Sequence, residues 1–207
     1  MIRHVRSIAG CRILTFTLLC SASLGQTAGQ PAAKPAAPQD KPAEAKPASG
    51  QALTLPGVEF TVPKDWKRDE VPAGPMAPQA ILRIPKAEGD AEDGIVRITH
   101  FREMKGKDDI NIDRWLGQVT KADGKPHTKA DAKITTSESG GIKLTVVDLT
   151  GGVKMTGWTE AKPNHRMIAA IVDHPQGPHY IVAAGGVKTM EKAATTIDSF
   201  LKGAKVK

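Results

Sequence analysis

Apolar and polar residues alternate in three short segments of the chain. The segments are 58–62 (VEFTV), 80–84 (AILRI) and 95–101 (IVRITHF). Because successive side chains of a strand point to opposite faces, a period of two predicts three half-buried strands. One face of the third predicted strand carries Ile95, Arg97, Thr99 and Phe101.

Two further pairs of strands are marked by the turns between them. Residues 133–152 contain Gly140 and Gly141 at their centre, and a Gly-Gly pair is a strong hairpin signal. Two apolar runs, 166–174 and 179–186, flank the sequence PQGP, where Pro and Gly indicate a tight turn. Residues 153–161 could continue the sheet. These segments predict an antiparallel arrangement.

The stretch DDINIDRW, residues 108–115, allows two interpretations. Asp109, Asn111 and Asp113 stand at every second position, as the first ligands of a calcium loop do. Such a loop also needs Gly at position six and Glu at position twelve, and this chain has Arg114 and Thr120 there. A calcium loop is therefore disfavoured.

A helix explains more of the same stretch. With Asn111 as the N-cap, one helical face would carry Ile112, Trp115, Leu116 and Val119. Ile110 would then pack on Trp115 as a hydrophobic staple. In this interpretation Arg114 points away from the apolar face, which makes it a candidate for binding a partner.

The C-terminal segment repeats apolar residues at helical spacing. The stripe consists of Met190, Ala193, Ala194, Ile197, Phe200 and Leu201. Thr189 can cap this helix, and Glu191 suits its positive end. Two helices and several hairpins predict an α+β domain, with a mostly antiparallel sheet and the helices packed on its faces.

Residues 1–25 have the features of a secretion signal. A basic start is followed by a short apolar run and by small residues, with cleavage expected before Gln26 or after Ala22. The run is too short to span a bilayer, so no transmembrane helix is expected in the mature chain. We therefore expect export to the periplasm or the exterior. A lipid anchor on Cys20 is the alternative, although Leu19 fits the preceding position badly.

The next segment, 26–52, is rich in Pro, Ala and Lys and has no large apolar residue. It is expected to be a disordered tether, which leaves one folded domain over 53–207. Cys11 and Cys20 are the only cysteines, so the mature chain would contain no disulfide. Residues 53–207 hold 23 basic and 20 acidic residues, and this near balance argues against a nucleic-acid partner.

Few residues suggest catalytic or metal chemistry. His174 and His179 lie across a turn, with Asp173 beside them, but two histidines without a clear third ligand make a poor zinc site. The acidic sequence EGDAEDG, 88–94, is more typical of a solvated hairpin tip than of a cation site. No serine stands in a hydrolase elbow, and GGVKT, 185–189, departs from a phosphate loop. No cofactor is expected.

The aromatic residues are few and are expected to serve the core first. Trp66, Trp115, Trp158 and Tyr180 are typical of core or sheet-covering positions in a small domain. A cleft lined by Trp66, Trp115 or Trp158 would instead distinguish a binding protein from a scaffold.

Several short motifs together resemble a known group of proteins. They are VEFTVPKDWKRDE, NIDRWLGQ, DLTG and a final strand, Gly-Gly and helix ending in SFL. The chain resembles uncharacterised exported bacterial proteins that are similar to the PsbP-like fold, over roughly residues 53–203. The resemblance implies an α/β/α sandwich around an antiparallel sheet. It also implies a binding or assembly subunit, and it assigns no functional residue.

These observations favour an exported, non-catalytic binding or assembly module on a flexible tether, with an unknown protein or small-molecule partner in the cell envelope. Arg114, Trp66 and Trp158 are its candidate binding residues. The alternatives are a metal-dependent envelope enzyme, using His174, His179 and Asp173, and a structural envelope protein.

Overall fold

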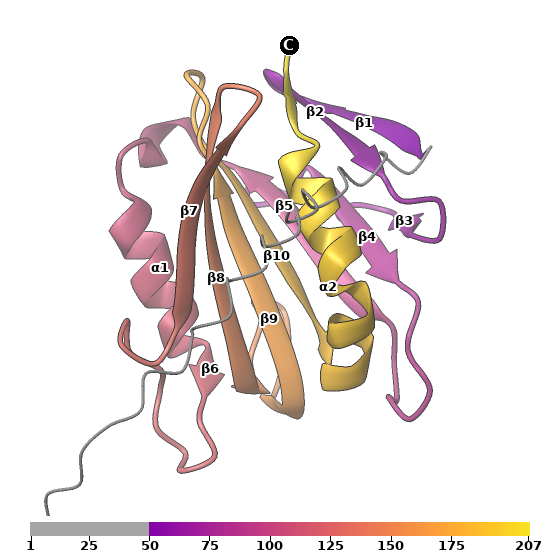
Figure 1. Ribbon diagram of the computed structural model, residues 1–207, viewed down its shortest axis with the longest axis vertical. Helices are drawn as coiled ribbons and strands as arrows, with labels where there is room; N and C mark the ends of the chain where they lie inside the picture. Colours follow the sequence, from indigo (N-terminus) through magenta and orange to yellow (C-terminus); the bar gives the residue numbers. More distant parts are fainter. Residues whose placement is uncertain (1–49) are drawn as a thin grey trace, which may run out of the picture. The chain divides into compact units, whose positions relative to one another are not determined.

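The computed structural model of this chain describes residues 50–207 (Figure 1). The predicted secretion signal, Cys20 and all but the last residues of the predicted tether lie outside this range. The strands are β1 (Gln51–Leu55), β2 (Val58–Val62), β3 (Lys67–Asp69), β4 (Ala80–Ile84), β5 (Gly94–His100), β6 (Val119–Thr120), β7 (Lys133–Ser139), β8 (Ile142–Val153), β9 (Lys162–Val172), β10 (His179–Gly186) and β11 (Lys205–Val206). The helices are η1 (Arg102–Met104), α1 (Asp108–Gly117) and α2 (Val187–Lys202).

The strands form two antiparallel sheets. The large sheet has the order β3-β4-β5-β10-β9-β8-β6, and β7 also pairs with β8 (Figure 1). The small sheet has the order β1-β2-β11, so the last strand pairs beside the first hairpin. The predicted α+β class, with a mostly antiparallel sheet and two main helices, is confirmed.

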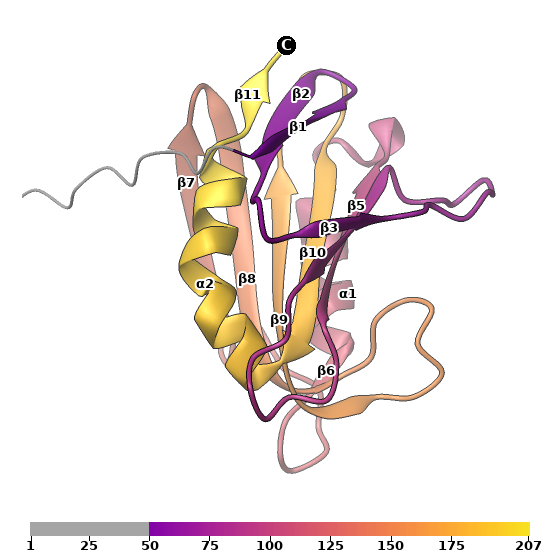
Figure 2. The same cartoon turned by 90° about the vertical axis from the view of Figure 1, so that its right-hand side faces the viewer.

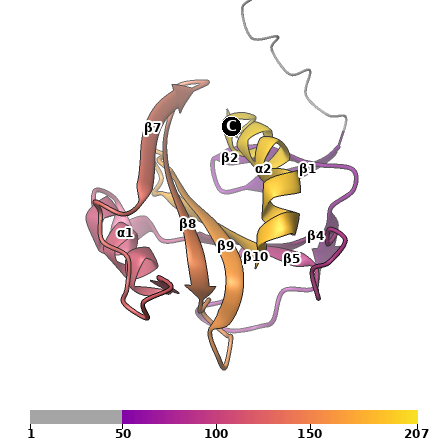
Figure 3. The ribbon, with the colours of Figure 1, turned by 60° about the horizontal axis from the view of Figure 1, so that its bottom comes forward.

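The two helices cover opposite faces of the large sheet (Figure 3). Alternate residues of each central strand therefore enter separate cores. Ile181 and Ala183 of β10 belong to the core under α2, whereas Tyr180 and Ala184 belong to the core under α1. This layering is the α/β/α sandwich that the resemblance implied.

Helix α2 buries the predicted stripe against the sheet, except for Ala194, which is half-buried. Met190, Ala193, Ile197, Phe200 and Leu201 are all buried. The ring of Phe200 stacks on Phe60 at 5.1 Å between centroids and lies tilted against Trp66 at 5.3 Å. Burial of an aromatic or branched side chain contributes about 1.5–3 kcal/mol, so this cluster fixes the small sheet to the helix.

The strands 58–62 and 80–84 lie where the alternation predicted them, and the Gly140–Gly141 turn joins β7 to β8 with positive φ at both glycines. The short strands β1, β3, β6 and β11 were not predicted. Residues 154–161 do not continue the sheet, because β8 ends at Val153.

Helix α1 begins earlier than predicted. It starts at Asp108, so Asn111 lies inside the helix and is buried instead of capping it. Ile110 is 58% exposed, and the predicted hydrophobic staple is therefore wrong. Asp108 and Asp109 occupy the first turn, where negative charge interacts favourably with the helix dipole. Ile112, Trp115 and Leu116 are buried as predicted, whereas Val119 belongs to β6.

A free backbone amide in the first turn of α2 is bonded by a carboxylate distant in sequence, because the N-cap residue makes no side-chain hydrogen bond. Asp90, from the turn between β4 and β5, accepts hydrogen bonds from the Thr189 amide at 2.7 Å and the Thr189 hydroxyl at 2.6 Å. The hydrogen bond from the Thr189 hydroxyl is the largest cause that lowers the pKa of Asp90, and the bond from the Thr189 amide lowers it too. Desolvation by burial opposes them. The acidic turn, which was expected to be solvated, therefore contacts α2 through Asp90. Thr189, predicted as the cap, is instead the third residue of the helix.

Replacement of Asp90 should destabilise the domain without altering its surface elsewhere. We expect Asp90→Ala to lower the free energy of unfolding by about 1–2 kcal/mol, because a buried helix-start amide loses its acceptor. Urea denaturation measures the change. Glu88→Ala, an exposed acid of the same turn, is the matched control and should leave the midpoint unchanged. Equal effects of the two variants would contradict this role of Asp90.

Candidate functional site: a two-arginine pocket

The floor of the site lies on the α1 face of the large sheet, where β5 and β10 pair. Arg97 stands opposite Val182, and Thr99 stands opposite Tyr180. On its other side, Arg97 stands opposite Ile81 of β4. The fully buried sheet residues under α1 come mainly from β8, β9 and β10, whereas Arg97 and Thr99 of β5 are only half-buried. Arg97 is half-buried here, among apolar neighbours on both sides.

One wall of the site is the last turns of α1. Arg114, Trp115 and Gln118 line it. Residues four apart on a helix lie on the same side, which places Gln118 beside Arg114. Arg114 is exposed and Trp115 is fully buried, so the wall passes from a charged rim to an apolar interior.

The opposite wall is the loop that follows β8. Met155 and Thr156 line it, and Arg97 Nη1 donates a hydrogen bond of 2.6 Å to the Thr156 carbonyl oxygen. This bond holds the guanidinium of Arg97 in place. Met76 contributes to the rim from the segment between β3 and β4, which extends away from the sheet in Figure 2.

The cavity enclosed by these elements has a volume of about 120 Å³. We call it the two-arginine pocket. It is lined by Met76, Arg97, Thr99, Phe101, Arg114, Trp115, Gln118, Met155, Thr156 and Val182.

The charge of the pocket is unbalanced. Its lining contains two guanidinium groups and no carboxylate. Between residues 50 and 207 the arginines that form ion pairs are Arg83 and Arg166, both outside this pocket. An arginine beside apolar surface, without a carboxylate partner, retains most of its capacity to bind an anion.

The neighbouring Tyr180 is held neutral. Its hydroxyl donates to the Met104 carbonyl oxygen at 3.3 Å, and desolvation by burial raises its pKa to about 12. A tyrosine with this pKa does not serve as a base near neutral pH. The arrangement suits recognition of an anion better than proton transfer.

The candidate residues from the sequence fall in different places. Arg114 lines the two-arginine pocket, as its position opposite the apolar stripe allowed. Trp66 is 6% exposed and packs in the core under α2, on the other face of the sheet. Trp158 is half-buried in the loop after β8, with its ring against His165 at 5.7 Å and Lys162 Nζ 4.3 Å above it. Neither tryptophan lines the pocket.

The histidines proposed as metal ligands lie where β9 ends and β10 begins, and the turn of the first hairpin packs on them. His179 Nε2 lies 2.9 Å from the Pro56 carbonyl oxygen, and its ring stacks on His100 at 4.5 Å. His174 Nδ1 accepts a hydrogen bond from the Gln176 amide. In the part of the chain that the structure describes, no three His, Cys, Asp or Glu side chains gather as metal ligands.

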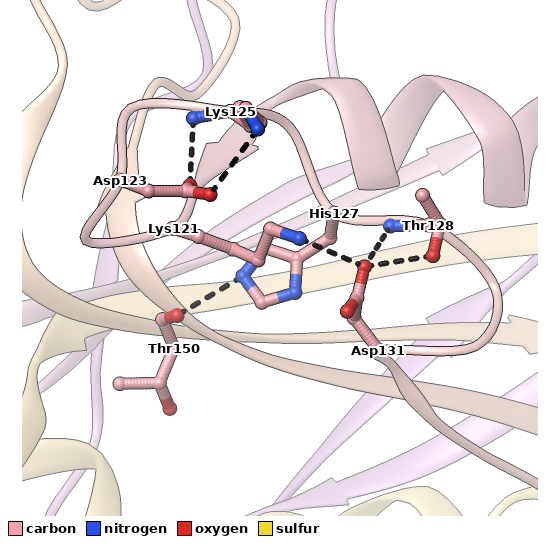
Figure 4. Close-up of polar contacts among 7 residues, drawn as sticks. All are labelled: Lys121, Asp123, Lys125, His127, Thr128, Asp131 and Thr150. Carbon is pink, nitrogen blue, oxygen red and sulfur yellow. Dashed lines mark hydrogen bonds and ion pairs between the residues drawn. The ribbon is translucent and has the colours of Figure 1, made fainter. Parts of the chain in front are cut away.

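A second polar cluster closes the loop between β6 and β7 (Figure 4). Asp131 accepts hydrogen bonds from the Thr128 hydroxyl, the Thr128 amide and Lys121 Nζ. The Thr128 hydroxyl bond is the main reason that the pKa of Asp131 falls to about 2. His127 of the same loop lies 3.1 Å from the Thr150 carbonyl oxygen. Asp131 is therefore a fixed negative charge that holds the loop, and a poor general base.

Sequence reasoning missed Arg97. The alternation in 95–101 placed it on a face with Ile95, Thr99 and Phe101, and a charged residue on an otherwise half-buried strand face was the available signal. What the sequence could not show is that this face lies beside Arg114.

Known proteins resemble this chain in solved structures and not in sequence families. No family profile and no curated protein matches the chain. The chain is similar in structure to cyanobacterial PsbP from Synechocystis sp. PCC 6803, with 12% identity and a TM-score of 0.49, over 81% of this chain and 98% of that one. The sequence motifs resemble the fold that is named after this protein.

Two further solved structures resemble the chain. A Pseudomonas aeruginosa protein of unknown function has 8% identity and a TM-score of 0.42, over 73% of this chain and 93% of that one. A Bacteroides thetaiotaomicron protein has 13% identity and a TM-score of 0.41, over 77% of this chain and 49% of that one. This chain therefore spans about half of the Bacteroides protein.

Proposed function

We propose that this protein is an exported, non-catalytic binding or assembly module, and that it holds its partner in the two-arginine pocket. The observation that carries the proposal is a pocket with two guanidinium groups, an apolar interior and no acid among its lining residues. Such a lining supplies binding energy and charge selectivity.

Export rests on residues 1–25, whose basic start, short apolar run and small residues are typical of a secretion signal. The following Pro-rich segment would let the domain reach a partner at some distance from its point of attachment or release. Within 50–207, no helix is both long enough and apolar enough to cross a membrane.

Catalysis is not supported by the site. The hydroxyl groups in the pocket belong to Thr99 and Thr156, and the lining includes no His, Asp, Glu, Lys or Cys that could activate them. Nucleophilic catalysis by a hydroxyl needs an adjacent base. This lining supports the proposal of a site that holds its partner.

Photocrosslinking in the native host tests both parts of this proposal. Benzoylphenylalanine is introduced at Met76, on the rim of the pocket, or at Lys192, which is exposed on α2 on the other face of the sheet. After illumination and fractionation, we expect a crosslinked product from position 76, in the envelope or secreted fraction, and none from position 192. Recovery of the protein in the cytoplasm would contradict export. The same products from both positions, or none from position 76, would contradict a partner at the pocket.

A further inference from the structure

The size of the two-arginine pocket restricts what can enter it. Its volume is about 120 Å³, whereas pockets for drug-sized ligands usually enclose roughly 300–1,000 Å³. A cavity of about 150 Å³ is known to hold one benzene molecule. The pocket is therefore matched to one ring-sized or branched apolar group.

The lining residues indicate that this group has an apolar part and an anionic part. Half-buried Phe101 and Val182 offer apolar surface, and the fully buried Trp115 borders the cavity. Arg97 and Arg114 offer donors, and within residues 50–207 the Arg97 side chain makes one hydrogen bond, to the Thr156 carbonyl oxygen. Since arginine matches a carboxylate with two parallel N–H donors, an apolar group that bears a carboxylate complements both parts.

The rim indicates a partner larger than the pocket. Met76, in the segment between β3 and β4, lines the pocket and is 70% exposed. An exposed methionine beside a pocket suits a surface that a protein partner covers, because its flexible side chain adapts to the partner. A free small acid would fill the pocket and leave this rim in water.

We propose, resting on the function proposed above, that the pocket takes the C-terminal residue of a protein partner. The α-carboxylate of that residue pairs with Arg97 and Arg114, and its aromatic or branched side chain packs on Phe101 and Val182. The residues that precede it in the partner cover Met76. Both the charge and the apolar group sit on one residue, as the small volume requires.

Matched small probes test this chemistry on the purified full chain. N-acetyl-phenylalanine reproduces a C-terminal residue, and N-acetyl-phenylalaninamide is its neutral isostere. By NMR titration, we expect saturable binding of the acid, at least roughly tenfold tighter than that of the amide, because the amide cannot form charge-assisted pairs with arginine. Equal affinity of the two probes would overturn the proposal, and so would tighter binding of phenyl phosphate.

Variants locate the binding. Arg114→Gln and Arg97→Gln should each weaken binding of the acid by roughly tenfold, since each removes one charged partner. Arg102→Gln changes an exposed arginine outside the pocket and should bind as the wild type does. Thermal denaturation of each variant confirms folding, and Arg114, being exposed, is the replacement least able to disturb it. Unchanged affinity in the Arg114→Gln variant would overturn the assignment.

A third probe identifies the source of the carboxylate. 3-Phenylpropanoate has the ring and the carboxylate but no peptide group. Weaker binding than N-acetyl-phenylalanine supports a protein terminus, whereas tighter binding would overturn it in favour of a free small acid. If no carboxylate binds while the crosslink from Met76 persists, the ligand class is wrong and the binding function stands. If both fail, the pocket is not a partner site.

Discussion

Trp115→Ala is expected to cause the largest loss of stability of any single replacement in the core under α1. Trp115 is 0% exposed, and its ring meets Tyr180 edge-on at 6.2 Å between centroids. Truncation of a fully buried tryptophan costs about 3–5 kcal/mol, through lost apolar burial and an unfilled cavity. Domains are stable by only about 5–15 kcal/mol, so the variant should unfold at a much lower urea concentration.

Two other replacements separate this effect from a general sensitivity to the loss of tryptophan. Trp158→Ala removes a half-buried ring from the loop after β8 and should cost less than half as much. Trp115→Phe keeps an aromatic ring against Tyr180 and should recover part of the loss. A Trp115→Ala variant as stable as Trp158→Ala would show that α1 is not required for the integrity of the sheet.

Acid is expected to destabilise the domain through His179 between about pH 6.5 and pH 4. The ring is 0% exposed, and desolvation by burial lowers its pKa to about 4, against the hydrogen bond to the Pro56 carbonyl oxygen, which raises it. The nearby His100 and His174 lower it further. In this window the unfolded chain binds a proton at this position and the folded chain does not, so stability falls as the pH falls. Complete passage through the window removes about 3 kcal/mol.

Urea denaturation at a series of pH values measures this contribution. In the His179→Gln variant the titrating group is absent, so its stability should depend less steeply on pH in this window than that of the wild type. Comparison at pH 7.5 supplies the control, because it gives the cost of the replacement itself when the histidine is neutral in both states. Parallel curves for the two proteins would mean that His179 binds its proton equally well in the folded and unfolded chains.

The parts of the fold that could be predicted are those set by local pattern. Alternation identified β2 and β4, and paired glycines identified the β7–β8 turn, because in each case the signal and the structure involve the same few residues. The stripe of α2 was clear for the same reason. Strand β1 was missed because its two buried leucines, Leu53 and Leu55, are too few for a pattern and depend on pairing with β2.

Features set by distant residues could not be predicted. The turn containing Asp90 was expected to be solvated, and nothing nearby in the sequence indicates that it supplies an acceptor to Thr189, 99 residues away. The start of α1 was misplaced because Asn111 is a good cap residue locally, and only packing shows that it is buried. Trp66 was a candidate for binding, but its ring packs against that of Phe200 in the core.

The candidate site also has one part that the local sequence predicts and one part that depends on distant residues. Arg114 was identified from the helical pattern alone, since a residue opposite an apolar stripe is exposed on any packed helix. Its partner, Arg97, depends on the register of β5 with β10 and on the side of the sheet that α1 covers. A pocket made from five separate segments leaves no contiguous motif in the sequence.

The pairing of β11 with β2 has a consequence for the order in which the domain folds. The pairs Lys205–Glu59 and Val206–Val58 join residues that are almost the whole domain apart in sequence. The closure entropy of so long a loop must be met before the contact forms, whereas the hairpins β7–β8 and β9–β10 close over a few residues. We therefore expect β11 to pair last in the small sheet. Until α2 has formed and placed the end of the domain beside β2, the β1–β2 hairpin has one unpaired edge.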